Sequence, residues 1–450
     1  MLGPTHASRP PLPATRKVTH EFTLSTGCEE VTRVRVALSS YRSKPHSGGQ
    51  GIYVRNLSRE LVRLGHEVEV FSGQPYPELD PGVRLTKLPS LDLYREDDPF
   101  RRPALREFRD RIDVAEFLTM CASGFPEPRT FSWRLARELR SRLGEFDVLH
   151  DNQTLGPGVL DLARRGLPTL TTIHHPITRD RRLELAAARG VQRITKRRWY
   201  AFVTMQRRVA QRSAHLLTVS EQSARDIVAD FEVPRDRLDV VPVGVDVETF
   251  AARPYAERHP GRLVTIASAD VPLKGLGVLV QALTRLDPLA WSELVVVGRP
   301  SERTSKALAD AGLLDRVRFE QGLSTVELAD LLASAQACVV PSLYEGFSLP
   351  TVEAMSTGTP VVASRVGALP ELVGDDAGLL VAPGDPAALA RGIADVLADP
   401  VRAAHLGAVG RRRAITTYSW AAVAQATSDI YERIVSEHKA SRAPSQETSA

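Results

Sequence analysis

Two glutamates, Glu345 and Glu353, are the residues of this chain whose spacing points most clearly to chemistry. A glycine and a proline lie between them, and Pro350 suits the first turn of a short helix that Gly358 would end. The free N–H groups at such a helix start favour anions. The segment therefore predicts an anion cradle with a carboxylate at each end, which would suit a phosphorylated sugar. The alternative is a surface loop with two solvated glutamates.

Other candidate ligand-binding residues follow predicted strands elsewhere in the chain. Gly48 and Gly49 occupy a turn between a strand and a helix, where glycine lets the backbone approach a ligand closely, although the loop lacks the G-x-G-x-x-G spacing of a dinucleotide site. Lys274 stands at the start of a helix, where its ammonium could reach a phosphate. His150 and His174 each end an apolar strand. A plain turn, a solvated lysine and buried histidines are the competing explanations.

The elements that must position these residues alternate between strands and helices. Apolar runs at 34–38, 68–71 and 146–150 are separated by helical patterns, and a second such series begins near Gly261. This alternation is typical of α/β proteins with doubly wound parallel sheets, whereas the segment 75–130 lacks it and reads as an insertion. We predict a disordered extension over 1–30, a first Rossmann-like domain over 31–245, a second over 246–418, a helix over 419–437 that could cross back to the first domain, and a disordered tail over 438–450.

Ligands of doubly wound sheets bind beyond the carboxyl ends of the strands. Two such domains that face each other would enclose a cleft. The Gly48–Gly49 loop, His150 and His174 would line it from the first domain. Lys274 and the segment from Glu345 to Glu353 would line it from the second.

Composition excludes several classes of protein. The net charge of +4 over 450 residues is too small to imply nucleic-acid binding. No run approaches the roughly 18 apolar residues of a membrane span, and the first thirty residues lack the apolar core of a secretory signal. Cys28, Cys121 and Cys338 are far apart, which favours reduced thiols and a cytoplasmic location. No Cys or His cluster has the spacing of a zinc site, so no metal is expected.

The segment 179–212 is basic and partly amphipathic. It could contact an anionic acceptor or the inner face of a membrane, as a peripheral attachment. The alternative is a long helix that packs its apolar stripe on the first domain and leaves its arginines in water.

Over roughly residues 33–435, the chain resembles the family 4 retaining glycosyltransferases, which have the GT-B fold of two Rossmann-like domains across a cleft. The most specific match is the run from Val340 to Met355, which contains both glutamates. Further matching segments are 358–363, 367–371, 378–381, 383–385, 47–54 and 64–68.

The resemblance implies catalytic roles for Glu345, Lys274 and His174. Glu345 would contact hydroxyls of the donor sugar, Lys274 would pair with the diphosphate, and His174 would lie near the transferring carbon. The Gly48–Gly49 loop would close over the diphosphate, and Glu353 would hold the ribose. The donor-binding residues that it implies are Gly48, Gly49, Phe347, Ser348, Leu349 and Glu353, with no metal ligand.

The implied activity is transfer of a hexosyl or N-acetylhexosaminyl group from a UDP-sugar or GDP-sugar to a hydroxyl, with retention and without metal or cofactor. The acceptor would be a small molecule, a glycan or a lipid-linked molecule. Ala269 stands where the family usually has an arginine, so a non-catalytic nucleotide-sugar-binding subunit is one alternative. A nucleotide-sugar epimerase of the same fold is another.

Overall fold

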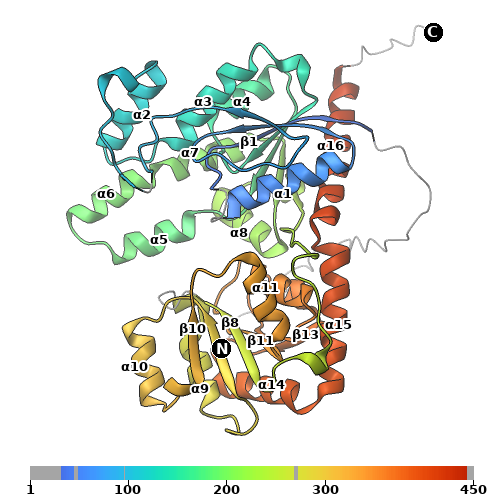
Figure 1. Ribbon diagram of the computed structural model, residues 1–450. Helices are drawn as coiled ribbons and strands as arrows, with labels where there is room; N and C mark the ends of the chain where they lie inside the picture. Colours follow the sequence, from blue (N-terminus) through green and yellow to red (C-terminus); the bar gives the residue numbers. More distant parts are fainter. Residues whose placement is uncertain (1–31, 45–48, 96, 268–271, 443–450) are drawn as a thin grey trace, which may run out of the picture. The chain divides into compact units, whose positions relative to one another are not determined.

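The computed structural model describes residues 32–44, 49–95, 97–267 and 272–442 (Figure 1). A seven-stranded sheet has the order β3-β2-β1-β4-β5-β6-β7, and every recorded pair within it is parallel. Helices cover both of its faces, as a doubly wound sheet requires. Its strands are β1 (Arg35–Ser40), β2 (Glu67–Ser72), β3 (Arg84–Lys87), β4 (Val148–Asn152), β5 (Thr169–Ile173), β6 (His215–Thr218) and β7 (Leu238–Val240).

A second parallel sheet has six strands in the order β10-β9-β8-β11-β12-β13. The two sheets confirm the predicted α/β class and the two doubly wound halves. Because β8 and β11 are neighbours in this sheet, the loops that follow them leave the same edge side by side. The strands are β8 (Arg262–Ile266), β9 (Glu293–Val297), β10 (Val317–Glu320), β11 (Ala337–Val340), β12 (Val361–Ser364) and β13 (Gly378–Val381).

The helices follow the strands along the chain, and their apolar faces form the cores. Val54, Leu57 and Leu61 of α1, at helical spacing, are fully buried with β1, β2 and β4 in one hydrophobic cluster. The helices beside the first sheet are α1 (Gly49–Arg63), α2 (Arg111–Cys121), α3 (Glu127–Leu139), α4 (Pro157–Arg164), α5 (Thr178–Ala187), α6 (Val191–Trp199), α7 (Ala201–Ala210) and α8 (Glu221–Phe231).

The remaining helices belong to the second half of the chain. Its core contains apolar residues of α9, α10 and α14 together with strands β8, β9, β11 and β12. The helices are α9 (Leu276–Leu283), α10 (Glu302–Asp310), α11 (Thr325–Ser334), α12 (Leu349–Ser356), α13 (Leu369–Val373), α14 (Pro386–Ala398), α15 (Pro400–Thr417) and α16 (Trp420–Arg442).

Helix α16 returns to the first sheet. Trp420, Val423, Tyr431 and Ile434 belong to the same buried cluster as α1 and β1. The predicted disorder from residue 438 begins too early, because α16 continues to Arg442 and no glycine or proline interrupts it. The extension over 1–30 and residues 443–450 lie outside the described residues.

The basic segment 179–212 forms three helices, α5, α6 and α7, rather than one long helix. In α7 the apolar residues Phe202, Val203 and Val209 are buried. Helix α6 has no buried residue, and its Val191 is 78% exposed. Trp199, at the end of α6, packs on the aromatic rings of Tyr94 and Phe125. The described apolar side chains therefore pack on the domain in α7 and at the end of α6, whereas the start of α6 is exposed.

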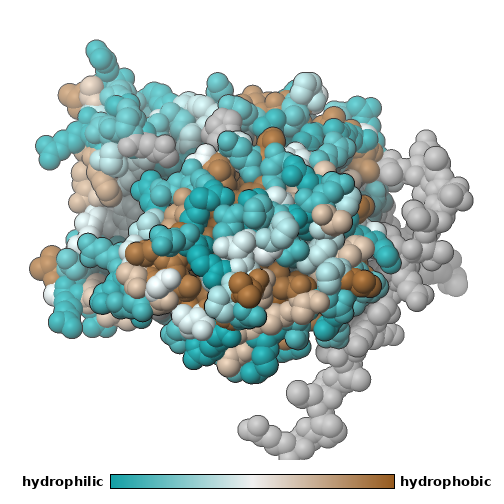
Figure 2. All heavy atoms as spheres, turned by 60° about the horizontal axis from the view of Figure 1, so that its bottom comes forward, coloured by the Kyte–Doolittle hydropathy of each residue, from teal (hydrophilic) through white to brown (hydrophobic). Residues whose placement is uncertain are grey.

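The surface is mixed in character. Figure 2 shows one face on which hydrophilic side chains cover most of the area and smaller hydrophobic areas lie among them. Such a mixture is ordinary for proteins in water. Within the described part of the chain, no helix has the length and apolar character needed to cross a membrane.

His150 is a structural residue, and its prediction as a residue lining a cleft was wrong. Its ring is fully buried: Nδ1 lies 2.6 Å from the Tyr431 hydroxyl of α16, and Nε2 lies 2.6 Å from Oγ1 of Thr172 in β5. Burial lowers the pKa of His150 to about 3, with a smaller contribution from His174. The neutral ring thus joins β4, β5 and α16.

We expect Tyr431→Phe to lower the free energy of unfolding by about 1–3 kcal/mol, because it leaves a buried ring nitrogen of His150 without a partner. Tyr255→Phe is the matched control. The Tyr255 hydroxyl is buried without a partner among the described residues, so its removal should cost little. Urea unfolding would measure both variants, and equal midpoints for Tyr431→Phe and the wild type would contradict this account.

Candidate active site

Lys274 and Glu345 meet where the loops after β8 and β11 leave the second sheet. Lys274 Nζ donates to Glu345 Oε1 over 2.7 Å, and Glu345 is only 5% exposed. Gly275 has φ near +70°, and a Cβ there would lie 1.9 Å from the carbonyl oxygen of Pro341. Glycine therefore lets the turn that carries the lysine press against the end of β11. The structure brings together two residues that are far apart in sequence.

The Glu345 carboxylate and its main chain are both held in place. Ser342 Oγ donates to Oε1 over 2.8 Å, and Ala368 N–H donates to the Glu345 carbonyl over 3.0 Å. The backbone of Gly367 approaches closely, since a Cβ there would lie 1.9 Å from that carbonyl oxygen. The carboxylate is thus an oriented acceptor with a cation on one oxygen.

The main chain after Glu345 offers donors to an anion. Ser348 precedes α12 without a side-chain cap, because its Oγ accepts from Thr351 Oγ1 over 2.9 Å instead. Within the described ranges, no acceptor is recorded for the main-chain N–H groups of Phe347 and Ser348. Together with Leu349, the first residue of α12, they form a helix start with the partial positive charge that binds phosphates.

Glu353 lies at the other end of this segment, in a cavity of about 690 Å³. Burial raises the pKa of Glu353 to about 7. None of the hydrogen bonds or ion pairs recorded for the described residues involves its carboxyl group. Residues of α1, α11 and α12 line the same cavity, including Asn56, Thr325 and Leu349. A half-buried carboxyl group for which the described residues provide no partner is poised to accept hydroxyl donors from a ligand.

His174 follows β5 and lines a second cavity, of about 470 Å³. Its Nε2 lies 2.7 Å from Oδ1 of Asn152, and Gln153 Oε1 accepts its main-chain N–H over 2.9 Å. The ring packs on the edge of Tyr53. Burial lowers the pKa of His174 to about 3, with help from His175. The ring is therefore neutral, and because Oδ1 accepts, Nε2 carries the proton and Nδ1 keeps its lone pair.

The glycine loop before α1 is described only from Gly49 onward, so Gly48 lies outside the described residues. A Cβ on Gly49 would meet no atom of the described residues within 4 Å, whereas one on Gly51 would lie 2.0 Å from the Lys44 carbonyl oxygen. Packing therefore requires glycine at 51, whereas the described part of the chain places no such restriction on position 49. Ala269 also lies outside the described residues.

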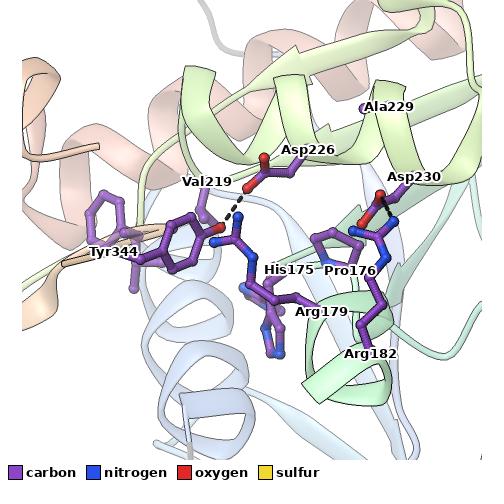
Figure 3. Close-up of a pocket in the computed structure, with 13 residues that line it drawn as sticks. His175, Pro176, Arg179, Arg182, Val219, Asp226, Ala229, Asp230 and Tyr344 are labelled. Carbon is purple, nitrogen blue, oxygen red and sulfur yellow. Dashed lines mark hydrogen bonds and ion pairs between the residues drawn. The ribbon is translucent and has the colours of Figure 1, made fainter. Parts of the chain in front are cut away.

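Residues of α5 and α8 that line the second cavity were not among the predicted site residues (Figure 3). The Arg179 guanidinium lies 3.4 Å above the Tyr344 ring, and the Tyr344 hydroxyl donates to Asp226. Arg182 pairs with Asp230. Arg179 and Arg182 lie in the basic segment 179–212, for which contact with an anionic acceptor was one prediction. Asp226 and Asp230 belong to no motif, so the sequence alone did not identify them.

The two cavities touch opposite halves of the segment between the glutamates. Gly346 and Phe347 line the 470 Å³ cavity with His174, whereas Leu349 and Glu353 line the 690 Å³ cavity. The N–H groups of Phe347 and Ser348, which have no recorded acceptor among the described residues, lie where these halves meet. The arrangement provides adjoining sites for two ligands, with an anion cradle where they would meet.

Comparisons with known proteins show which family the chain resembles. Residues 47–249 match the family model described as Glycosyltransferase Family 4, and residues 260–399 match the one described as Glycosyl transferases group 1. The chain is 55% identical over 407 residues to the MMP α-(1→4)-mannosyltransferase of Mycolicibacterium hassiacum, covering 89% of this chain and 98% of that protein. It is 33% identical over 432 residues to the D-inositol 3-phosphate glycosyltransferase of Xylanimonas cellulosilytica, covering 88% and 96%.

Solved structures share the fold at lower identity. Sucrose-phosphate synthase from Thermosynechococcus elongatus matches with a TM-score of 0.64 and 24% identity, over 90% of this chain and 100% of that one. Anabaena HepE in complex with UDP matches with a TM-score of 0.63 and 15% identity, over 89% and 100%. At these identities the likeness shows the fold alone.

The raised pKa of Glu353 predicts a pH-dependent stability. The folded protein holds a proton that the unfolded chain releases, so stability falls as the pH rises from about 4.5 to about 7. Glu353→Gln should remove this part of the fall in stability. At pH 8 its free energy of unfolding should exceed that of the wild type by about 1–3 kcal/mol, whereas at pH 4.5 it should not exceed it. Urea unfolding at both pH values would measure the difference, with exposed Glu248→Gln as the control. An equal effect of Glu353→Gln at both pH values would contradict the prediction.

Proposed function

The chain belongs to glycosyltransferase family 4, and on that premise we propose that it transfers mannose from GDP-mannose to a saccharide hydroxyl, forming an α-(1→4) linkage. The relative at 55% identity, an MMP α-(1→4)-mannosyltransferase, supports the sugar and the linkage. GDP-mannose is proposed as donor because it is an activated mannose that carries a diphosphate leaving group. A cavity of about 690 Å³ beside Glu353 is within the range of cavities that bind cofactor-sized ligands.

One observation carries the proposal: Lys274 meets Glu345, which precedes by two residues the N–H groups at the start of α12 for which the described residues provide no acceptor. The diphosphate would lie on these N–H groups, with the Lys274 ammonium as counter-charge. Glu345 would accept hydroxyls of the donor sugar, and Glu353 would accept those of the ribose. Fixed donors aimed at a leaving group stabilise the charge that develops on it during bond cleavage.

The proposed reaction retains the anomeric configuration. The bond between mannose C1 and the diphosphate oxygen breaks, and a bond from C1 to the acceptor oxygen forms on the same face. The acceptor proton passes to the departing diphosphate, which becomes free GDP. Lys274 and the helix start supply positive charge at the leaving group, so the proposed mechanism requires no metal.

The acceptor would enter the cavity of about 470 Å³ that His174 lines. His174 would contact the acceptor hydroxyl near C1 as a neutral ring, because its low pKa keeps it uncharged at neutral pH. Gly49 would approach the diphosphate from the side of α1, where no atom of the described residues fills the space of a Cβ. Donor and acceptor would thus meet over Gly346 and Phe347.

A transfer assay tests this proposal and separates it from its alternatives. GDP-mannose, a mannoside acceptor and the enzyme should give an α-linked product by NMR, and the rate should persist in EDTA. A changed sugar nucleotide without any acceptor would identify an epimerase. Nucleotide binding without turnover under any acceptor would identify a non-catalytic subunit.

We expect Lys274→Ala to lower kcat in this assay by about 10²–10³-fold, because the leaving diphosphate loses its cation. The control is Lys306→Ala, which removes an exposed lysine paired with Asp310 in α10. Circular dichroism would show that both variants fold. Full activity of Lys274→Ala would exclude the proposed role at the diphosphate.

We also propose that α6 contacts anionic membranes peripherally. Its exposed Val191 and Ile194 lie among basic residues that include Lys196, Arg197 and Arg198. The protein should co-sediment with phosphatidylserine vesicles at low salt and less so as the salt rises. Val191→Ser combined with Ile194→Ser should weaken the binding. No binding to acidic vesicles at low salt would exclude this contact.

A further inference from the structure

Two serines at the start of α8 form hydrogen bonds to one main-chain carbonyl group in the segment between Glu345 and Glu353. Ser220 Oγ donates to the Gly346 carbonyl oxygen over 2.5 Å, and Ser223 Oγ donates to the same oxygen over 3.1 Å. Both serines are essentially fully buried. One carbonyl thus takes two hydroxyl donors from a single helix start, although it lies more than a hundred residues away in sequence.

The hydrogen-bonding capacity of Ser220 is used on both sides. Its Oγ accepts the Ser223 N–H over 2.9 Å as the N-cap of α8, and its proton goes to Gly346. Ser223 makes no cap and contributes only its hydroxyl to this carbonyl. Ser223 is therefore the better residue to mutate. The loss of Ser220 would also weaken α8, whereas the loss of the Ser223 hydroxyl would not.

The neighbouring groups of the segment are held by other contacts. The Glu345 carbonyl accepts from Ala368, at the start of α13. Glu371 of α13 in turn accepts the Glu221 N–H of α8 over 3.0 Å. The helix starts of α8 and α13 thus contact each other and fix consecutive carbonyls, so the segment has little freedom to turn.

Because the peptide group is planar, the hydrogen bonds to the Gly346 carbonyl also fix the direction of the Phe347 N–H. The Gly346 carbonyl and the Phe347 N–H belong to one peptide plane and point in opposite directions when the bond is trans. Holding the carbonyl against α8 therefore directs the Phe347 N–H away from α8. This is one of the N–H groups for which the described chain provides no acceptor.

We propose that Ser220 and Ser223 are positioning residues that aim the Phe347 N–H at the diphosphate of the donor. This inference rests on the proposed function and adds to it. In the proposed complex the serines touch neither substrate and act only through the peptide group between Gly346 and Phe347. A fixed amide needs no reorganisation as charge develops on the leaving group, whereas a freely turning amide loses that advantage. The acceptor-side domain thereby helps to shape the donor site.

Calorimetry with GDP and GMP tests the inference, because only GDP carries the second phosphate. We expect Ser223→Ala to weaken GDP binding by about three- to tenfold and to leave GMP binding unchanged. In the transfer assay kcat should fall by about tenfold or more, with a smaller change in the KM for GDP-mannose. Ser223→Thr should restore both, because it keeps the hydroxyl.

Ser301→Ala is the matched control, since Ser301 caps α10 by accepting from Thr304 N–H and lies outside both cavities. It should bind and turn over like the wild type. If Ser223→Ala binds GDP and turns over like the wild type, or if its affinities for GDP and GMP fall equally, the positioning role is overturned while the proposed function stands. If the wild type neither binds GDP nor transfers mannose, the proposed function fails, and this inference falls with it.

Discussion

The buried carboxylate of Glu345 is the constraint on which the rest of the candidate site depends. An ionised group that is 5% exposed needs compensating partners, and it has them in Lys274 and Ser342. These contacts require the loops after β8 and β11 to touch, which the close approach at Gly275 allows, and Gly367 lets the loop after β12 approach the Glu345 carbonyl. Removal of either charge would leave the other poorly compensated. The pair therefore fixes both the cation and the start of the segment that leads into α12.

The same segment joins the two sheets. Tyr344, Gly346 and Glu371 of the second half contact α8 of the first half through hydrogen bonds. Helix α16 packs on the first sheet after α15, which packs on α12 of the second. Rigid support from both halves suits a site that must hold a sugar within reach of its acceptor, because small displacements of reacting groups are costly to rate.

Much of this arrangement could be predicted from the sequence, because its causes are local. The alternation of apolar runs with helical patterns predicts the two parallel sheets. Lys274 and Glu345 both follow strands, and parallel strands end at a common edge. His150 also lies near the carboxyl end of a parallel strand, but its side chain is buried in the core. Both faces of β4 are buried. Its sequence therefore lacks the alternation of apolar and polar residues that would distinguish buried from exposed positions.

Other features depend on packing that no motif records. The edge strand β3 has only four residues and was missed inside a segment read as an insertion. Arg179 and Asp226 converge on Tyr344 only because α5 and α8 meet the second half of the chain there. The hydroxyls of Ser220 and Ser223 likewise acquire a role through a carbonyl far away in sequence. Such pairings follow from tertiary contacts, which a single sequence does not display.

The most direct test of the central claim is a crystal structure with GDP bound. We expect the β-phosphate to accept hydrogen bonds from the main-chain N–H groups at Phe347 to Leu349, with Lys274 Nζ turned to it at about 3 Å. Glu353 should meet the ribose hydroxyls. A β-phosphate bound elsewhere, with Lys274 still paired only to Glu345, would contradict the account.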